Sequence, residues 1–281
     1  MKILPDTAVV ITGAASGIGR ALALEMGARS ARLLLADLDA AGLQQVSSAL
    51  QAQGVVCYTL TTDTGDEAAV AALAAETQRL FGAADIVVNN AGVSLSTSVE
   101  QLQSADAHWL MNINFWGVVH GCRHFLPQLR SRPQALLVNI SSIFAMLSMP
   151  TQSMYNASKA AVRAFSDALR EELRGSQVGV LCVHPGGIQT RIADNARMLD
   201  IALVATNPAE MRSNFNSSAR TSAQDAARAI VRAIESDQSR LLIGLDARLG
   251  DWLYRLAPSR SSNWLTRLVQ WQRRRRAQDT A

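Results

Sequence analysis

The stretch AVVITGAASGIG at residues 8–19 decides the fold. It opens with a short apolar run, and RALALEM at residues 20–26 follows it with helical composition. The order is therefore strand, glycine-rich turn, helix. The glycines let the backbone turn sharply, and the first N–H groups of the helix are free donors that favour a diphosphate. The glycine spacing, G-x3-G-x-G, differs from the G-x-G-x-x-G fingerprint, but the segment still predicts a nucleotide site.

A second apolar run, residues 33–36, ends in Asp37, eighteen residues after Gly19. A carboxylate at this point can accept hydrogen bonds from the adenosine ribose hydroxyls, and it would repel a 2′-phosphate. Ser16 and Leu38 bring no positive charge to the same place. The sequence therefore favours NAD(H) over NADP(H).

Strand and helix patterns then alternate along the chain. Strands are expected at residues 55–61, 86–88, 135–140, 178–183 and 241–243, and helices at 39–53, 66–81, about 104–131, after Tyr155, and at 222–236. Buried strands joined by helices predict an α/β fold, a single Rossmann-type, doubly wound parallel sheet with helices on both faces. We expect residues 1–245 to form the NAD-binding and catalytic domain, with a substrate lid at about 190–221. Residues 246–281 form a C-terminal amphipathic, basic extension.

Composition narrows the class of protein. With 48% hydrophobic and 18% charged residues in 281, the chain can bury a sizeable core. Cys57, Cys122 and Cys182 are odd in number and lie in apolar runs, which is typical of reduced thiols in a cytoplasmic protein. No Cys/His cluster predicts a metal, and no apolar stretch reaches the roughly 18 residues of a membrane span. The net charge of +4 equals the four arginines at 273–276, and no aromatic-interleaved basic face accompanies them, so we expect no nucleic-acid partner.

A second informative stretch is SSIFAMLSMPTQSMYNASK at residues 141–159. Ser142 follows a buried strand at its carboxyl end, where open α/β sheets bind ligands. Tyr155 and Lys159 are four residues apart, so they share one face of the expected helix. The chain has only two lysines among its 27 cationic Lys and Arg residues, Lys2 and Lys159. A site that needs one compact charge beside a phenol would require lysine rather than the planar fork of arginine.

Together these residues resemble the short-chain dehydrogenase/reductase family over about residues 6–245. The resemblance rests on Thr12-Gly13-x3-Gly17-x-Gly19, Asn89-Asn90-Ala91-Gly92, Asn114 in Asn-Phe-Trp-Gly, Ser142, Tyr155-x3-Lys159, and Pro185-Gly186 with Thr190. It implies an enzyme that interconverts alcohols and ketones with a nicotinamide cofactor. It also implies a homodimer or homotetramer, assembled through the helices at about 106–131 and 153–174.

The resemblance implies the following site residues. Tyr155 would be the acid/base, Lys159 would bind the nicotinamide ribose, Ser142 would orient the substrate oxygen, and Asn114 would hold a water that links Lys159 to solvent. Cofactor contacts are implied for Gly13, Ser16, Gly17, Ile18, Gly19, Asp37, Asp63, Asn89, Ala91, Gly92, Tyr155, Lys159, Pro185, Gly186, Ile188 and Thr190. Because a free tyrosine has a pKa of about 10, we expect the Lys159 ammonium to lower the pKa of Tyr155 by roughly 1–3 units.

The expected substrate is a lipophilic secondary alcohol or ketone, steroid-like or long-chain. Segments expected to border the pocket are apolar, although they could instead pack against the body or a second subunit: Ile143, Phe144, Met146, Leu147, Met149, Ile192, Met198 and Leu199. Two alternatives remain open. One is an NADPH-dependent 3-oxoacyl thioester reductase, which Asp37 disfavours, and the other is a non-catalytic NAD-binding module.

The extension carries two apolar sets. Leu249, Trp252, Leu253 and Leu256 form an amphipathic stripe, and Trp264, Leu265, Leu268 and Trp271 form a second one before the four arginines. We expect the first helix to pack on protein, as a subunit or lid contact. The second helix is the candidate for a weak peripheral contact with an anionic membrane.

Overall fold

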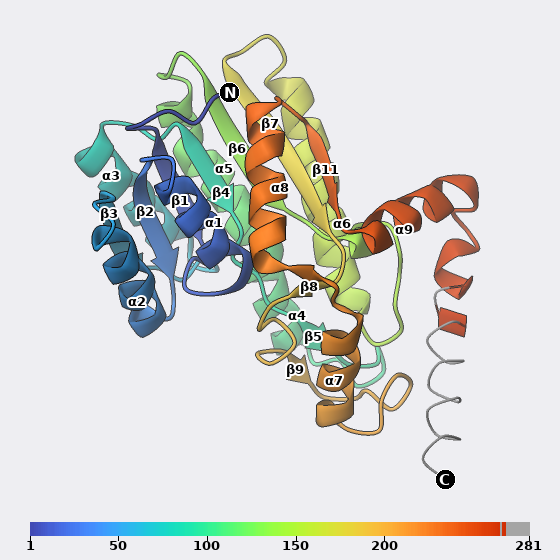
Figure 1. Ribbon diagram of the computed structural model, residues 1–281. Coiled ribbons are helices and arrows are strands. Elements are labelled where there is room, and N and C mark those ends of the chain that lie inside the picture. The colour runs from blue at the N-terminus through green and yellow to red at the C-terminus, as the bar shows by residue number, and fades with distance from the viewer. Residues whose placement is uncertain (265, 268–281) are drawn as a thin grey trace.

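The computed structural model describes residues 1–264 and 266–267 (Figure 1). Its centre is a seven-stranded sheet in the order β11-β7-β6-β4-β1-β2-β3. All neighbouring strands of this sheet run parallel. The strands are β1 (Ala8–Thr12), β2 (Arg32–Asp37), β3 (Cys57–Thr61), β4 (Ile86–Asn89), β6 (Ala135–Ile140), β7 (Val178–Pro185) and β11 (Arg240–Ile243). The expected doubly wound parallel sheet is confirmed, although β3 begins two residues later than expected.

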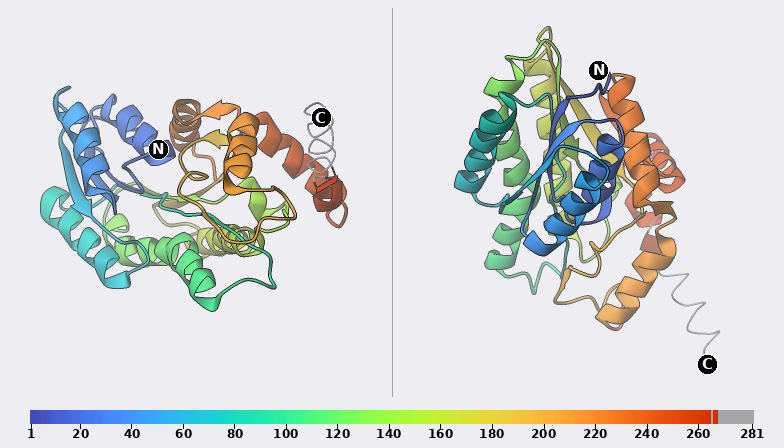
Figure 2. Two further views of the ribbon diagram at one scale, coloured as in Figure 1. Left: turned by 90° about the horizontal axis from the view of Figure 1, so that it is seen from below. Right: turned by 60° about the vertical axis from the view of Figure 1, so that its left-hand side comes forward.

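Helices cover both faces of the sheet, as both views in Figure 2 show. Alternate residues of one strand serve opposite layers, since Val9 and Ile11 belong to one core cluster and Ala8 and Val10 to the other. The first layer is formed by α1 (Gly17–Gly27), α2 (Ala40–Gln51) and α8 (Ala223–Glu235), and the second by α3 (Glu67–Phe81), α5 (Gly117–Leu129) and α6 (Ser153–Glu172).

Side-chain caps fix where several helices begin. The carboxylate of Asp39 accepts a hydrogen bond from the Gly42 N–H at the start of α2, and Asp66 does the same for Ala68 at the start of α3. Ser222 accepts from the Asp225 N–H and starts α8. These short polar residues therefore set the ends of helices whose apolar faces cover the sheet.

The helical region expected at about 104–131 consists of three pieces. It contains α4 (Ser104–Met111), a π-helical turn at Asn112–Trp116, and α5. A π-helical turn inserts a residue into the helix and often marks a functional site. Here it carries Asn114, which sequence periodicity alone could not place.

The segment after β7 is folded rather than irregular. It includes β8 (Ile188–Gln189), β9 (Arg197–Met198), α7 (Pro208–Ser218) and β10 (Thr221–Ser222). β8 pairs with β10, and β9 pairs with β5 (Leu95–Ser96), the loop strand after β4. These pairings bring the two ends of the segment together and join it to the loop after β4.

Helix α9 (Leu245–Leu256) follows the last strand and projects from one edge of the body (Figure 1). The second apolar set expected in the extension lies outside the described residues except for Trp264. Within the described part of the chain, no helix combines the length and the apolar character needed to cross a membrane.

Candidate active site

The carboxyl ends of the central strands open into one cleft of about 430 Å³. It lies where the strand order reverses between β1 and β4, which is the ligand position of open α/β sheets. The cleft gathers most of the residues expected from the sequence: Gly13, Ser16, Gly17, Ile18, Asp37, Asp63, Ala91, Gly92, Ser142, Tyr155, Lys159, Pro185, Gly186, Ile188 and Thr190.

The glycine-rich turn between β1 and α1 forms one wall. Gly13 has a φ of +66°, and a Cβ on it would lie 2.8 Å from the Cα of Ala91. A Cβ on Gly19, which does not line the cleft, would lie 2.1 Å from the carbonyl oxygen of Gly13. Larger residues are therefore excluded where the turn folds back on itself, and the N-terminus of α1 stays open toward an anionic group.

Asp37 ends β2 beside this turn. One carboxylate oxygen accepts from the Ala15 N–H at 2.9 Å, and the other accepts from the Asp39 N–H at 3.1 Å. The carboxylate thus braces the glycine-rich turn while it also lines the cleft. The turn and the acidic residue together fit the diphosphate and ribose of a dinucleotide.

Asn90, rather than Asn89, connects the end of β4 to the site. The side-chain amide of Asn90 donates to the carbonyl oxygens of Thr12 at 2.9 Å and Gly13 at 3.1 Å. Asn89 points to the opposite face, where it donates to Asn139 at 2.8 Å and is buried. Strand alternation was the available signal, because neighbouring residues face opposite sides. The expected cofactor contact of Asn89 stays a prediction. Its side chain is directed at Asn139 and does not line the cleft.

The three expected catalytic residues come together deep in the cleft. Ser142 follows β6, while Tyr155 and Lys159 lie one turn apart on α6. Tyr155 and Ser142 both line the cleft, and the Lys159 Nζ donates to the Ile140 carbonyl at 3.1 Å. The Lys159 ammonium lies 5.9 Å from the centre of the Tyr155 ring. A phenol, a hydroxyl and an ammonium thus share one largely buried pocket.

The pKa of Tyr155 differs from the expectation. Burial raises the pKa of Tyr155, and the hydrogen bond with Ser142 opposes this only in part. Burial also lowers the pKa of Lys159, to about 8. The direction of the Tyr155 pKa shift is thus opposite to the expected lowering, because burial of the phenol has the larger effect. In this state Tyr155 is therefore a neutral phenol at pH 7, suited to donate a proton to a carbonyl oxygen.

Asn114 is buried next to the site and does not line the cleft. Its side-chain oxygen accepts from the Val93 N–H at 2.8 Å, and its amide donates to the Val93 carbonyl and to the Ser158 hydroxyl. A Cβ on Gly92 would lie 3.2 Å from Asn114 Oδ1 and 3.4 Å from Lys159 Nζ. Asn114 thus ties the loop after β4 to α6, and its expected contact with a water stays a prediction.

The side of the cleft beside Tyr155 is apolar. Val93, Phe144 and Ile192 line it, and all three pack with the buried Tyr155 and Leu95. Other residues expected here lie elsewhere, since Ile143, Met146 and Leu147 pack with Ala247 of α9. Sequence pattern could not separate Phe144 from Ile143, Met146 and Leu147, because all four belong to one apolar segment, and it did not indicate Val93.

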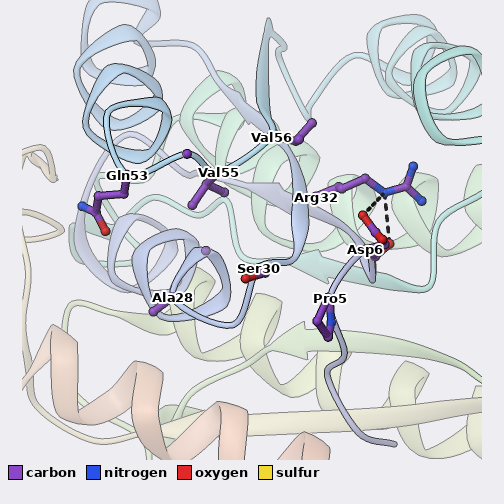
Figure 3. Close-up of a pocket in the computed structure, with 10 residues that line it drawn as sticks. Pro5, Asp6, Ala28, Ser30, Arg32, Gln53, Val55 and Val56 are labelled. Atoms are coloured by element: carbon purple, nitrogen blue, oxygen red, sulfur yellow. Dashed lines mark hydrogen bonds and ion pairs between the residues drawn. The ribbon is translucent and has the colours of Figure 1, made fainter.

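A second hollow lies at the amino ends of β2 and β3, opposite the candidate site (Figure 3). Its charged residues are Arg32 and Asp6, and these pair with each other. Among the described residues, no group of three His, Cys, Asp or Glu side chains could hold a metal ion. Cys57, Cys122 and Cys182 are free and buried, as expected.

The profile of the short chain dehydrogenase family matches residues 7–199. The chain belongs to the short-chain dehydrogenase family. A relative named as the oxidoreductase SadH, from Mycobacterium tuberculosis, is 39% identical over 92% of this chain and 94% of its own length. Dehydrogenase/reductase SDR family member 7B of Mus musculus is 36% identical over 70% of this chain and 62% of its own.

Solved structures of short-chain dehydrogenases share the fold. A short-chain dehydrogenase/reductase from Burkholderia phymatum in complex with NAD superimposes with a TM-score of 0.84 at 30% identity, over 92% of this chain and 95% of that one. Levodione reductase gives a TM-score of 0.76 at 27% identity, over 87% and 97%. The protein is therefore an oxidoreductase of the short-chain dehydrogenase family that acts on CH–OH groups with a nicotinamide cofactor.

Proposed function

We propose that the protein interconverts a lipophilic secondary alcohol and its ketone with NAD(H), using Tyr155 as the acid/base. The observation that carries this proposal is the Ser142, Tyr155 and Lys159 group, placed in one cleft beside the apolar wall of Val93, Phe144 and Ile192. When bound, the nicotinamide supplies or accepts the hydride. The chain supplies the proton, the orientation of the oxygen and a site shielded from water.

Each residue has a defined task in the reduction direction. Ser142 and Tyr155 line the same cleft, so both hydroxyls can address one substrate oxygen. Tyr155 donates its proton to that oxygen as negative charge develops there. Lys159, whose ammonium lies 5.9 Å from the centre of the Tyr155 ring, favours the phenolate that remains through its positive charge. In the oxidation direction the same phenolate accepts the proton from the alcohol.

The preference for NAD(H) rests on the end of β2. Asp37 lines the cleft, and among the described residues the cations that line it are Lys159 and Arg191, neither of which follows β2. Repulsion between one carboxylate and a 2′-phosphate about 4 Å away corresponds to about 1–4 kcal/mol near a protein surface. We expect kcat/KM with NADH to exceed that with NADPH by about 10–10³-fold.

The variant Asp37→Asn with Leu38→Arg tests this preference, because asparagine keeps an acceptor for the Ala15 N–H while the charge is reversed locally. Its NADH:NADPH ratio should fall at least about tenfold. Leu38→Arg alone separates the added cation from the lost carboxylate. A parent enzyme that prefers NADPH would refute the assignment and direct attention to Arg20, which lines the adjoining hollow with Gly17 and Thr190.

A screen of steroid, long-chain and small ketones with NADH tests the substrate class. The apolar wall should lower KM for the larger, lipophilic ketones, since burial of apolar surface contributes about 25 cal/mol per Å². A 3-oxoacyl thioester reduced best, and with NADPH, would instead support the alternative reductase activity.

The family resemblance also supports two proposals about the protein in the cell. We propose a homodimer or homotetramer assembled through α4, α5 and α6. We further propose a cytoplasmic location, supported by three free, buried cysteines.

A further inference from the structure

Helix α9 contacts the body through one narrow face. Ala247, Gly250 and Asp251 are its buried residues. A Cβ on Gly250 would lie 2.7 Å from Leu147, and the Asp251 carboxylate pairs with Arg240 at the start of β11. The first extension helix therefore packs on the body of the same chain through small and acidic residues, while its expected contact with a second subunit or the lid stays a prediction. Leu249, Trp252 and Leu256 of the expected amphipathic set are exposed and do not form the contact face.

The opposite face of α9 is apolar and exposed. Leu245, Leu249, Trp252 and Leu256 are 76%, 60%, 57% and 64% exposed. These residues follow one another by four, three and four positions, so they form a single row along the helix. The row spans about 17 Å at 1.5 Å per residue. We call these four side chains the apolar stripe.

The stripe is a concentration of exposed apolar side chains and not a scatter of single ones. Of the thirteen exposed large hydrophobic side chains in the described part of the chain, five fall within residues 245–264: the stripe and Trp264. Single exposed leucines are ordinary on protein surfaces, whereas a contiguous apolar row marks an interaction site.

Charge identifies the kind of surface that fits this row. Residues 246–281 contain eight arginines and three aspartates and so carry +5, which leaves −1 for residues 1–245 of a chain with net charge +4. Two of the three aspartates interact with the body. Asp251 forms an ion pair with Arg240, and Asp246 accepts a hydrogen bond from the Gly187 N–H. Arg248 and Arg260 are exposed and form no ion pair within the described residues. The described part of the extension thus exposes the apolar stripe together with Arg248 and Arg260.

A second copy of the chain fits this surface poorly. Two extensions of +5 would repel each other, and one row of four side chains falls short of the roughly 800 Å² per partner that a stable interface buries. An anionic bilayer meets both features, because leucine and tryptophan enter the boundary between headgroups and acyl chains while arginines bind lipid phosphates.

We propose that α9 docks the protein on an anionic membrane surface, with the apolar stripe inserted in the interface plane. The helix lies parallel to the membrane, and its buried face stays on the body. This orientation follows from the two faces of α9. Ala247 and Gly250 pack one face on the body, and the apolar stripe is exposed on the other. The proposal concerns location only and does not depend on the identity of the substrate.

Co-sedimentation with vesicles tests the proposal on the full-length chain. We expect binding to phosphatidylcholine vesicles that contain phosphatidylserine and much weaker binding to phosphatidylcholine alone. The variant Leu249→Ser with Leu256→Ser should bind about a hundredfold more weakly, since each leucine removed from water contributes more than about tenfold. Leu199→Ser with Leu203→Ser is the matched control, because these leucines are 53% and 61% exposed and lie outside the extension. It should bind as the parent does.

Three results would overturn the proposal. The parent could fail to bind the anionic vesicles at low salt. The stripe variant could bind as tightly as the parent, which would assign the binding to the arginines alone. Sedimentation velocity could show that the stripe variant loses an oligomer that the parent forms while neither binds vesicles, which would assign the stripe to a second copy of the chain.

Discussion

Tyr155→Phe should lower kcat for ketone reduction by about 10²–10⁴-fold, the range that a positioned acid or base contributes. The substitution removes only the phenol oxygen of a residue that lines the cleft. The ring remains and still packs with Leu95, Leu110 and Phe144. We therefore expect an unchanged fold and a dissociation constant for NADH close to that of the parent, measured by fluorescence titration beside steady-state kinetics.

Tyr58→Phe is the matched control for this variant. Tyr58 lies on β3 and is 45% exposed, outside the residues that line the cleft. It should leave both kcat and NADH affinity unchanged. Turnover of Tyr155→Phe within about tenfold of the parent would remove Tyr155 as the principal acid/base.

Lys159→Arg should impair turnover by at least about 10²-fold even though the charge is kept. Lys159 is 3% exposed, and its Nζ lies close to Gly92 and to the Ile140 carbonyl. The planar guanidinium is larger and cannot occupy this position as a point charge. Lys2→Arg is the control, because Lys2 is exposed and is the chain's other lysine. Normal turnover in Lys159→Arg would show that any cation suffices here.

The lowered pKa of Lys159 also leads us to expect that the free energy of unfolding depends on pH. Its pKa is lowered from 10.5 to about 8 in the folded protein, so the unfolded chain binds more protons between these values. The free energy of unfolding should therefore rise with pH from about 8 to about 10.5, by up to roughly 3 kcal/mol from this group. Lys159→Met removes the titrating group, so its denaturation midpoint should lack this rise, whereas Lys2→Met should keep it. An identical pH profile in the parent and Lys159→Met would contradict the burial of the ammonium.

The sequence predicted those features that depend on local pattern. Short apolar runs located the strands, and glycine spacing located the turn after β1, because only glycine fits where Gly19 meets Gly13. Asp37 could be placed at the cleft because it ends a strand. The choice between Asn89 and Asn90 depends on the alternation along β4, in which Val87 and Asn89 face the same side.

Features that depend on packing between distant segments were less predictable. Ile143 and Phe144 are neighbours in sequence, yet one packs under α9 and the other lines the cleft. The sequence indicated an amphipathic helix at α9, but such a pattern does not say which face contacts the body. In the structure Gly250 lies against Leu147, so the face of small residues makes the contact. The direction of the Tyr155 pKa shift likewise depends on burial of the phenol, which only the folded structure shows.

The most direct test of the proposed function follows the transferred hydride itself. NADH that carries deuterium at the transferred C4 position is incubated with the enzyme and the best ketone from the screen, and the alcohol is examined by mass spectrometry and NMR. We predict one deuterium on the carbinol carbon, formed by the parent and lost with Tyr155→Phe. An alcohol without deuterium at that carbon, or labelled product formed equally by Tyr155→Phe, would contradict hydride transfer at this site.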